Sequence, residues 1–112
     1  PKQLMQSLKK LAQLPSETKV YFGHEYTETN LRFAKTIEPS NHAIQQKLFE
    51  IQNLRHQGKY TTPSTLQAEK QTNPFLRCET DALQQSMLQQ YPELERDAVS
   101  IFAKIRQLKD QF

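Results

Sequence analysis

Residues 40–58, with the sequence SNHAIQQKLFEIQNLRHQG, carry the clearest secondary-structure signal in the chain. Apolar residues recur there at the three- and four-residue spacing of an amphipathic helix, namely Ile44, Leu48, Ile51 and Leu54. Ser40 or Asn41 can cap the start of such a helix, and Gly58 suits the left-handed residue that follows its end. The segment therefore predicts a helix with one buried face and two defined ends.

Upstream of this segment the sequence predicts two more helices and a strand. Residues 2–13 form an amphipathic pattern whose apolar positions are Leu4, Met5, Leu8 and Leu11, with Leu14 just beyond. The run 20–22 is rich in β-forming residues and predicts the one convincing strand. The next helix is expected to begin at a Thr27 cap and to stop before Pro39.

Downstream, three more helices follow a loop at residues 58–64. Ser64 and Gln67 predict a capping box for a short helix that runs to about Thr72. Thr80 can cap the next helix, and Pro92 suits the first position of a final one. The sequence therefore predicts a mainly α-helical fold.

The chain is polar for a folded protein. It has 112 residues, 36% of them hydrophobic, and a mean hydropathy of −0.81. That length allows one domain or part of a larger one. The polarity suits either a long-helix domain with much solvated surface or a fragment whose apolar faces meet an absent partner. The chain also starts in mid-pattern without an initiator methionine, as a piece of a longer protein would.

Charge, hydropathy and cysteine content narrow the function classes. The net charge of +3 comes from cations interleaved with carboxylates, which favours no nucleic-acid partner. No run approaches the roughly 18 apolar residues of a membrane span, and no signal pattern opens the chain. The single Cys78 excludes an internal disulfide and a multi-cysteine zinc site, which favours a cytoplasmic location. With no histidine beside it, Cys78 is expected to be an inert thiol.

His24 is the first candidate for chemistry, because it follows the glycine that ends the predicted strand. Strand ends that lead into loops commonly present ligands, and a neutral imidazole there can bind zinc, iron or manganese. Tyr26 would lie beside whatever His24 binds. A surface histidine without a ligand role explains the same position, and one histidine cannot supply the three protein ligands that catalytic zinc usually takes.

Arg106 and Lys109 are the second candidate, because their three-residue spacing near the end of the last predicted helix places them on one face. Such a pair can hold a carboxylate. A solvated cationic pair favoured by the helix dipole, with Asp110 as a partial neutraliser, explains them equally. Four phenylalanines lie on or beside apolar stripes and are expected in the core: Phe33, Phe49, Phe75 and Phe102.

Several motifs occur together in order: YFGHEYT at 21–27, TPSTL at 62–66, NPFLR at 73–77 and IRQLKDQF at 105–112. With them the chain resembles the glyoxalase II family, the hydroxyacylglutathione hydrolases, over nearly its whole length. The resemblance implies the helical C-terminal domain of that family, preceded by the last helix and short strand of its metallo-β-lactamase αβ/βα sandwich. It divides the chain into a sandwich remnant at 1–26 and a helical glutathione-binding domain at 27–112.

The resemblance also implies a chemistry. Enzymes of this family hydrolyse S-D-lactoylglutathione to D-lactate and glutathione at a centre of two divalent metals, with zinc expected first and iron or manganese as alternatives. His24 matches a metal ligand of the family, Tyr26 a glutathione contact, and Arg106 with Lys109 the pair that grips the glycyl carboxylate. The family's histidine-rich motif, its further histidine ligand and its bridging aspartate are absent from these 112 residues.

Two expectations follow from that absence. The chain alone is expected to be inactive, with the N-terminal metallo-β-lactamase domain as its missing partner and with apolar surface exposed that can drive self-association. The alternative hypothesis is a helical interaction or anion-binding module that never belonged to an enzyme.

Overall fold

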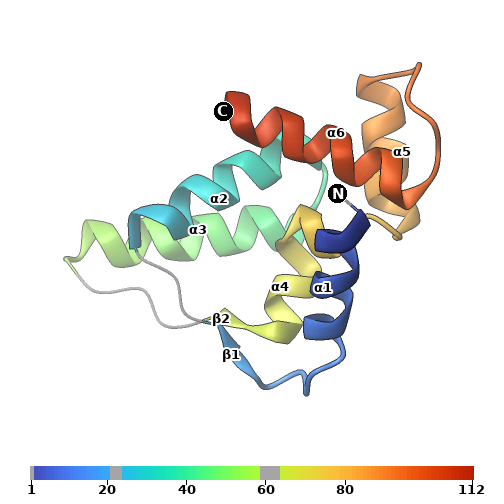
Figure 1. The fold of residues 1–112 in the computed structure, drawn as a ribbon. Helices are drawn as coiled ribbons and strands as arrows, with labels where there is room; N and C mark the ends of the chain where they lie inside the picture. Colours follow the sequence, from blue (N-terminus) through green and yellow to red (C-terminus); the bar gives the residue numbers. More distant parts are fainter. Residues whose placement is uncertain (1, 21–23, 59–63) are drawn as a thin grey trace.

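The structure is a computed structural model that describes residues 2–20, 24–58 and 64–112, with the backbone alone for residues 2, 20, 24–26 and 64. Within these ranges it is mainly helical, with two short strands (Figure 1). The elements in chain order are α1 (Lys2–Ala12), β1 (Lys19–Val20), α2 (His24–Ile37), α3 (His42–His56), β2 (Ser64–Thr65), α4 (Leu66–Thr72), the 3₁₀ helix η1 (Pro74–Leu76), α5 (Asp81–Gln90) and α6 (Ala98–Gln111). In the described part of the chain, no helix is long and apolar enough to cross a membrane.

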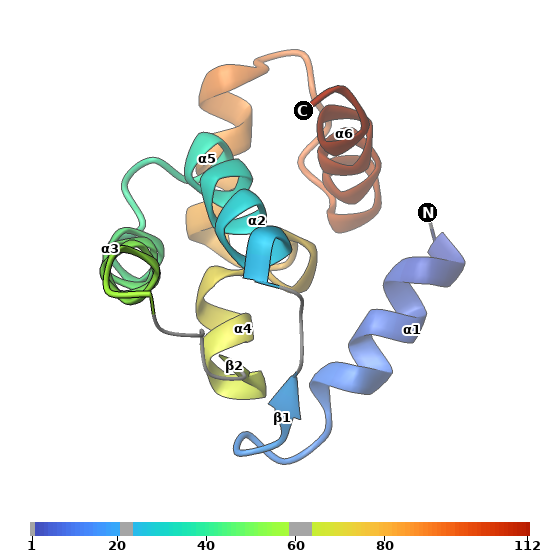
Figure 2. The same cartoon turned by 90° about the vertical axis from the view of Figure 1, so that its left-hand side faces the viewer.

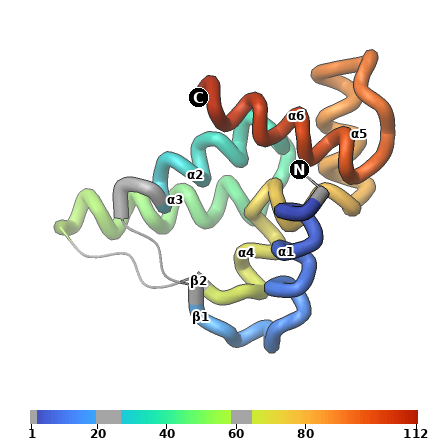
Figure 3. Tube along the Cα trace, viewed as in Figure 1, coloured from blue at the N-terminus to red at the C-terminus, as the bar shows by residue number. Residues whose placement is uncertain are grey.

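The helices pack around one main core. α2 and α3 lie side by side, and α4 lies between α3 and α1 (Figure 2). The C-terminal half of α6 passes over α2 (Figure 3). The largest side chains of this core are almost completely buried and come from α2, α5 and α6: Ile37, Leu83, Met87, Ile101, Phe102 and Ile105. A smaller cluster of Leu31, Leu48 and Ile51 joins α2 to α3.

Several predicted helix ends are confirmed. The Asn41 side chain accepts hydrogen bonds from the backbone N–H groups of Ala43 and Ile44, at 3.0 and 3.3 Å, and so caps α3. Thr80 caps α5 in the same way through the N–H of Leu83. Gly58 follows α3 with a φ of 71°, the left-handed conformation that glycine adopts without strain.

Three predicted starts are wrong by a few residues. α2 begins at His24 rather than at Thr27, and ion pairs of Glu28 with Arg32 and Arg55 hold its first turns against α3. Thr65 caps α4 in place of Ser64, and no capping box forms because the third helical residue is Ala68.

The third wrong start is that of the last helix. Pro92 does not begin it, because Asp97 caps α6 through a 2.8 Å hydrogen bond from the N–H of Ser100. Leu94, expected inside the helix, lies in the preceding loop and still packs against the core.

The predicted strand has a partner that the sequence did not reveal. Lys19 pairs with Thr65 and Val20 with Ser64 in an antiparallel two-stranded sheet. The N–H of Leu66 then donates to the carbonyl of Thr18 at 2.8 Å, which continues the pairing. Residues 21 and 22 of the predicted strand lie outside the described residues, as does most of the predicted loop.

Two predicted apolar faces need correction. Phe49 was expected in the core, but it lies on the outer side of α3 and is 64% exposed. Among the described side chains of α1 only Met5 is buried, and Leu8 packs against the core from its edge. The other apolar residues of this pattern are exposed, as expected of a face without its partner: Leu4, Leu11 and Leu14.

Candidate functional site

The predicted cationic pair lies where α6 passes over α2. The ammonium of Lys109 donates a 3.0 Å hydrogen bond to Oδ1 of Asn30, which is 79 positions earlier in the sequence. Phe33 of α2 and Ile105 of α6 both belong to the main buried core. The fold therefore brings the C-terminal turns of α6 to the middle of α2.

The Lys109 ammonium lies near two aromatic rings that contact each other. Its Nζ lies 5.2 Å from the ring centroid of Phe33 and 5.7 Å from that of Phe112. The rings themselves meet edge to face, with centroids 5.5 Å apart at an interplanar angle of 62°. Because the faces of aromatic rings attract cations, these contacts favour an ordered position for a side chain that is otherwise flexible.

Arg106 differs from its predicted partner. It is exposed on α6, and it makes no hydrogen bond or ion pair with any other described residue. Asp110, considered as a neutraliser, forms no ion pair with either cation among those residues. The pair thus combines one lysine that is held in place with one arginine whose guanidinium is available to an anion from solvent.

The backbone of His24 and Tyr26 lies in the first turn of α2, and residues 21–23, which precede it in the predicted strand end, are outside the described residues. The side chains of His24 and Tyr26 are also outside the described part of the structure. Asn30 is six residues after His24, which corresponds to about 9 Å along the helix axis at 1.5 Å per residue. Lys109 is therefore bound to the same helix that carries both predicted residues, about one turn beyond Tyr26 and less than two turns beyond His24.

The residues described by the structure contain no group of three or more histidine, cysteine, aspartate or glutamate side chains that could hold a metal ion. His42 and His56 are both exposed. Within this part of the chain the donor set does not fit a metal centre, which normally needs three protein ligands.

Sequence reasoning missed two residues of this site, Asn30 and Phe112. Asn30 follows position 26 by four residues and precedes Phe33 by three, so the three positions share one face of α2. That spacing could have drawn attention to Asn30. The ring contact of Phe112 depends on how α6 crosses α2, which no local pattern encodes.

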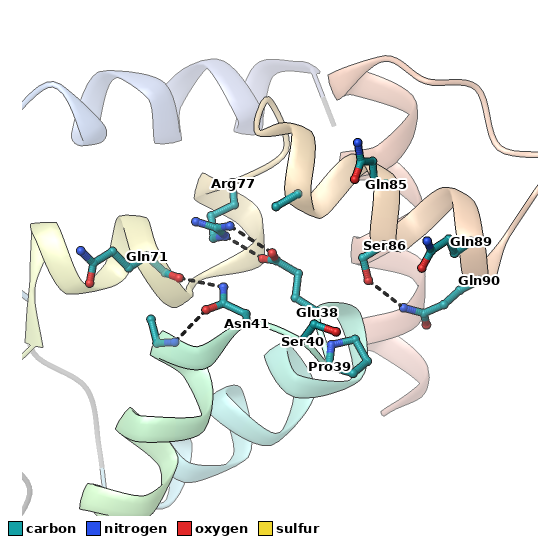
Figure 4. Close-up of a pocket in the computed structure, with 12 residues that line it drawn as sticks. Glu38, Pro39, Ser40, Asn41, Gln71, Arg77, Gln85, Ser86, Gln89 and Gln90 are labelled. Carbon is teal, nitrogen blue, oxygen red and sulfur yellow. Dashed lines mark hydrogen bonds and ion pairs between the residues drawn. The ribbon is translucent and has the colours of Figure 1, made fainter.

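A polar groove of about 760 Å³ lies elsewhere, between the ends of α2 and α4 and one side of α5 (Figure 4). The Arg77–Glu38 ion pair lies within it, with N–O distances of 2.6 and 3.0 Å. Ser86 and Gln90 both donate to the carbonyl of Ile37, at 2.5 and 3.0 Å. These polar groups already form hydrogen bonds with one another, and the bonds from Ser86 and Gln90 join α5 to the end of α2.

Comparison with known proteins agrees with this architecture. Residues 25–112 match the family model described as the hydroxyacylglutathione hydrolase C-terminus. The chain is 48% identical over 106 residues to a hydroxyacylglutathione hydrolase of Rhizobium etli, covering 95% of this chain and 40% of that protein. It is 46% identical to the enzyme of that name from a Synechococcus species and 40% identical to that from Pseudomonas fluorescens, covering 100% of this chain and 41% and 44% of those proteins.

The chain belongs to the hydroxyacylglutathione hydrolase family and corresponds to its C-terminal part. It spans about two fifths of the length of the curated relatives it matches.

Proposed function

We propose that this chain forms the glutathione-binding C-terminal part of a thiolester hydrolase that converts S-D-lactoylglutathione to D-lactate and glutathione. The observation that carries the proposal is the Lys109 ammonium, which is held against α2 less than two turns from His24. A glutathione thiolester has its glycyl carboxylate and its reacting carbonyl at separate points. Two sites on one helix suit such a substrate.

In this proposal Arg106 and Lys109 bind the glycyl carboxylate of glutathione. Arg106 supplies a planar fork of N–H donors that can bind both carboxylate oxygens, and Lys109 supplies an ordered point charge. Tyr26, one helical turn before Asn30, contacts the tripeptide between that carboxylate and the thiolester. Fixing the remote end of the substrate places the thiolester carbonyl near His24 and reduces the entropic cost of reaction.

His24 would be one ligand in a centre of two divalent metals, with zinc expected first and iron or manganese as alternatives. When bound, such metals polarise a carbonyl and lower the pKa of water. The described residues do not assemble that centre, so the remaining ligands would come from the part of the relatives that this chain does not match. That part is also our proposed partner for the exposed face of α1, formed by Leu4, Leu11 and Leu14. We place the protein in the cytoplasm on the ground of its single, unpaired cysteine.

The purified chain tests this proposal directly. We expect no hydrolysis of S-D-lactoylglutathione, and we expect glutathione to shift the NMR signals of Arg106 and Lys109. Glutathione with its glycyl carboxylate converted to an amide is the matched control and should leave these signals unchanged. Equal shifts from both compounds would refute carboxylate recognition, and hydrolysis by the chain alone would refute its inactivity.

The exposed face of α1 favours a second candidate, a helical interaction module without an enzymatic origin. The two candidates differ in their ligand. A module of this kind would self-associate or bind a protein through α1 and would ignore glutathione. Light scattering of the purified chain, combined with the glutathione titration, separates them.

A further inference from the structure

The amide of Asn30 has only one orientation that satisfies its contact with Lys109. A lysine ammonium carries three N–H donors and no acceptor, so it must face an oxygen. Oδ1 of Asn30 therefore faces Lys109, as the 3.0 Å contact shows. The amide nitrogen of the same side chain must then point away from the ammonium.

This leaves two N–H donors of Asn30 without a partner among the described residues, on an exposed side chain. These N–H groups belong to the same amide whose oxygen accepts the hydrogen bond from Lys109. Asn30 is on the same face of α2 as Phe33. Lys109 in turn uses one N–H on Asn30 and has two left. A ligand that meets Lys109 here therefore meets donors from two different helices.

Resting on the proposed function above, we propose that Asn30 is both the positioning residue for Lys109 and a further donor to the glycyl carboxylate of glutathione. Its oxygen holds the ammonium beside the rings of Phe33 and Phe112, and its N–H groups face the anion. Holding a lysine in place before binding removes the entropic cost of ordering its long side chain when the ligand arrives. The site then presents charge from Lys109 and Arg106 and a neutral donor from Asn30.

Two substitutions of Asn30 separate its two roles. Asn30→Ala removes both the acceptor for Lys109 and the donors to the carboxylate. Asn30→Asp keeps an oxygen for Lys109 but replaces the donors with a negative charge. Asn53→Ala is the matched control, because Asn53 is an exposed asparagine on a neighbouring helix and shares the change in helix propensity.

The first measurement concerns Lys109 alone and needs no ligand. The ring currents of Phe33 and Phe112 displace the ε-methylene NMR signals of Lys109, which are assigned by their loss in Lys109→Gln. We expect Asn30→Ala to move these signals toward those of exposed lysines, and Asn30→Asp and Asn53→Ala to leave them in place. Unchanged signals in Asn30→Ala would overturn the positioning role.

The second measurement is a titration with glutathione. We expect the affinity to fall about tenfold in Asn30→Ala, the effect of one hydrogen bond to a charged group, and at least as much in Asn30→Asp. Asn53→Ala should stay within about twofold of the unmodified chain, as surface changes usually do. Wild-type affinity in Asn30→Asp would overturn the donor role.

The two proposals fail in distinguishable ways. If glutathione causes no shifts in the unmodified chain, the proposed function and the donor role fall together, and the ligand-free Lys109 signals still decide the positioning role. If Arg106→Ala and Lys109→Gln weaken binding while Asn30→Ala does not, the proposed function stands and the inference about Asn30 is overturned.

Discussion

The two ends of α2 are fixed in different ways. At the C-terminal end, the Glu38 carboxylate accepts hydrogen bonds from both Nε and Nη2 of Arg77, and the two side chains are only 5% and 15% exposed. The carbonyl of Ile37 accepts two more hydrogen bonds from α5. The C-terminal end of α2 is therefore held by buried hydrogen bonds and a buried ion pair.

At the N-terminal end the contacts are electrostatic and lie nearer to solvent. Glu28 binds Arg32 of its own helix and Arg55 of α3, and these arginines are 58% and 46% exposed. This is the end that carries His24 and Tyr26. α2 is therefore anchored in the core at the end away from His24 and Tyr26, so its two ends should respond differently to substitution.

Arg77→Ala should give the largest effect, because it leaves the Glu38 carboxylate buried without a partner. We expect a loss of about 3–5 kcal/mol in the free energy of unfolding, the usual effect of removing one member of a buried pair. Urea denaturation followed by circular dichroism measures it. The double variant Arg77→Met with Glu38→Gln removes both charges and should recover much of the loss. A double variant as unstable as Arg77→Ala would show that the charge is not the cause.

Cys78 reports on the same buried end, because it directly follows Arg77 and is 3% exposed. Burial, helped by the negative charge of Glu79, raises the pKa of the Cys78 thiol from 9.0 to about 12. The thiolate population at pH 8 is therefore lower by about a thousandfold than in the unfolded chain, since each pKa unit is a factor of ten. We expect iodoacetamide to leave Cys78 unmodified in the native chain and to alkylate it in urea. Rapid native alkylation would mean that this end opens readily.

Glu28→Gln tests the solvent-facing end and should have a smaller, pH-dependent effect. Partial burial tends to raise the pKa of Glu28, but hydrogen bonds and charge from Arg32 and Arg55 outweigh it and hold the pKa below the ordinary 4.5. Because the folded pKa is the lower one, this contribution is complete above about pH 4.5 and is lost as the pH falls through the folded pKa. We expect Glu28→Gln to cost about 1 kcal/mol at pH 7, in the range of partly exposed pairs.

The pH series provides the check on Glu28. The stabilities of the unmodified chain and Glu28→Gln should converge as the pH falls through the lowered pKa of Glu28, since the protonated glutamic acid no longer forms ion pairs. Glu50→Gln is the control, because Glu50 is exposed and forms no ion pair with another described residue. A constant difference between the unmodified chain and Glu28→Gln at every pH would contradict the role of the charge.

The helices could be predicted from the sequence because their signals are local. Asn41 and Thr80 cap their helices through residues two or three positions away, so these caps do not depend on the tertiary packing. The spacing of apolar residues in α3 likewise indicates its buried face without information about the neighbouring helices. The start of α6 could not be placed, because Pro92 and Asp97 are both acceptable starts on local grounds. The exposure of Phe49 was missed because an apolar side chain beside an apolar stripe predicts burial. Whether another helix covers that side chain depends on the tertiary packing, which the local sequence does not reveal.

The candidate site divides in the same way. The spacing of Arg106 and Lys109 placed both on α6, but nothing in that spacing distinguished the exposed arginine from the lysine held by Asn30. That difference arises from a contact between residues 79 positions apart. Long-range contacts of this kind depend on the helix crossing, and only the structure supplies it.

Arg106→Ala should give the smallest change in stability. Its guanidinium is exposed and has no partner among the described residues, so we expect the free energy of unfolding to change by no more than about 0.5 kcal/mol. Glutathione binding should nevertheless weaken strongly, because the fork that would hold both carboxylate oxygens is lost. Arg96→Ala, on a loop arginine 50% exposed, is the control and should change neither stability nor binding strongly. If Arg106→Ala lowers the free energy of unfolding as much as Glu28→Gln does, then Arg106 stabilises the fold. The distinction between residues that stabilise the fold and residues that face the ligand would then not hold for α6.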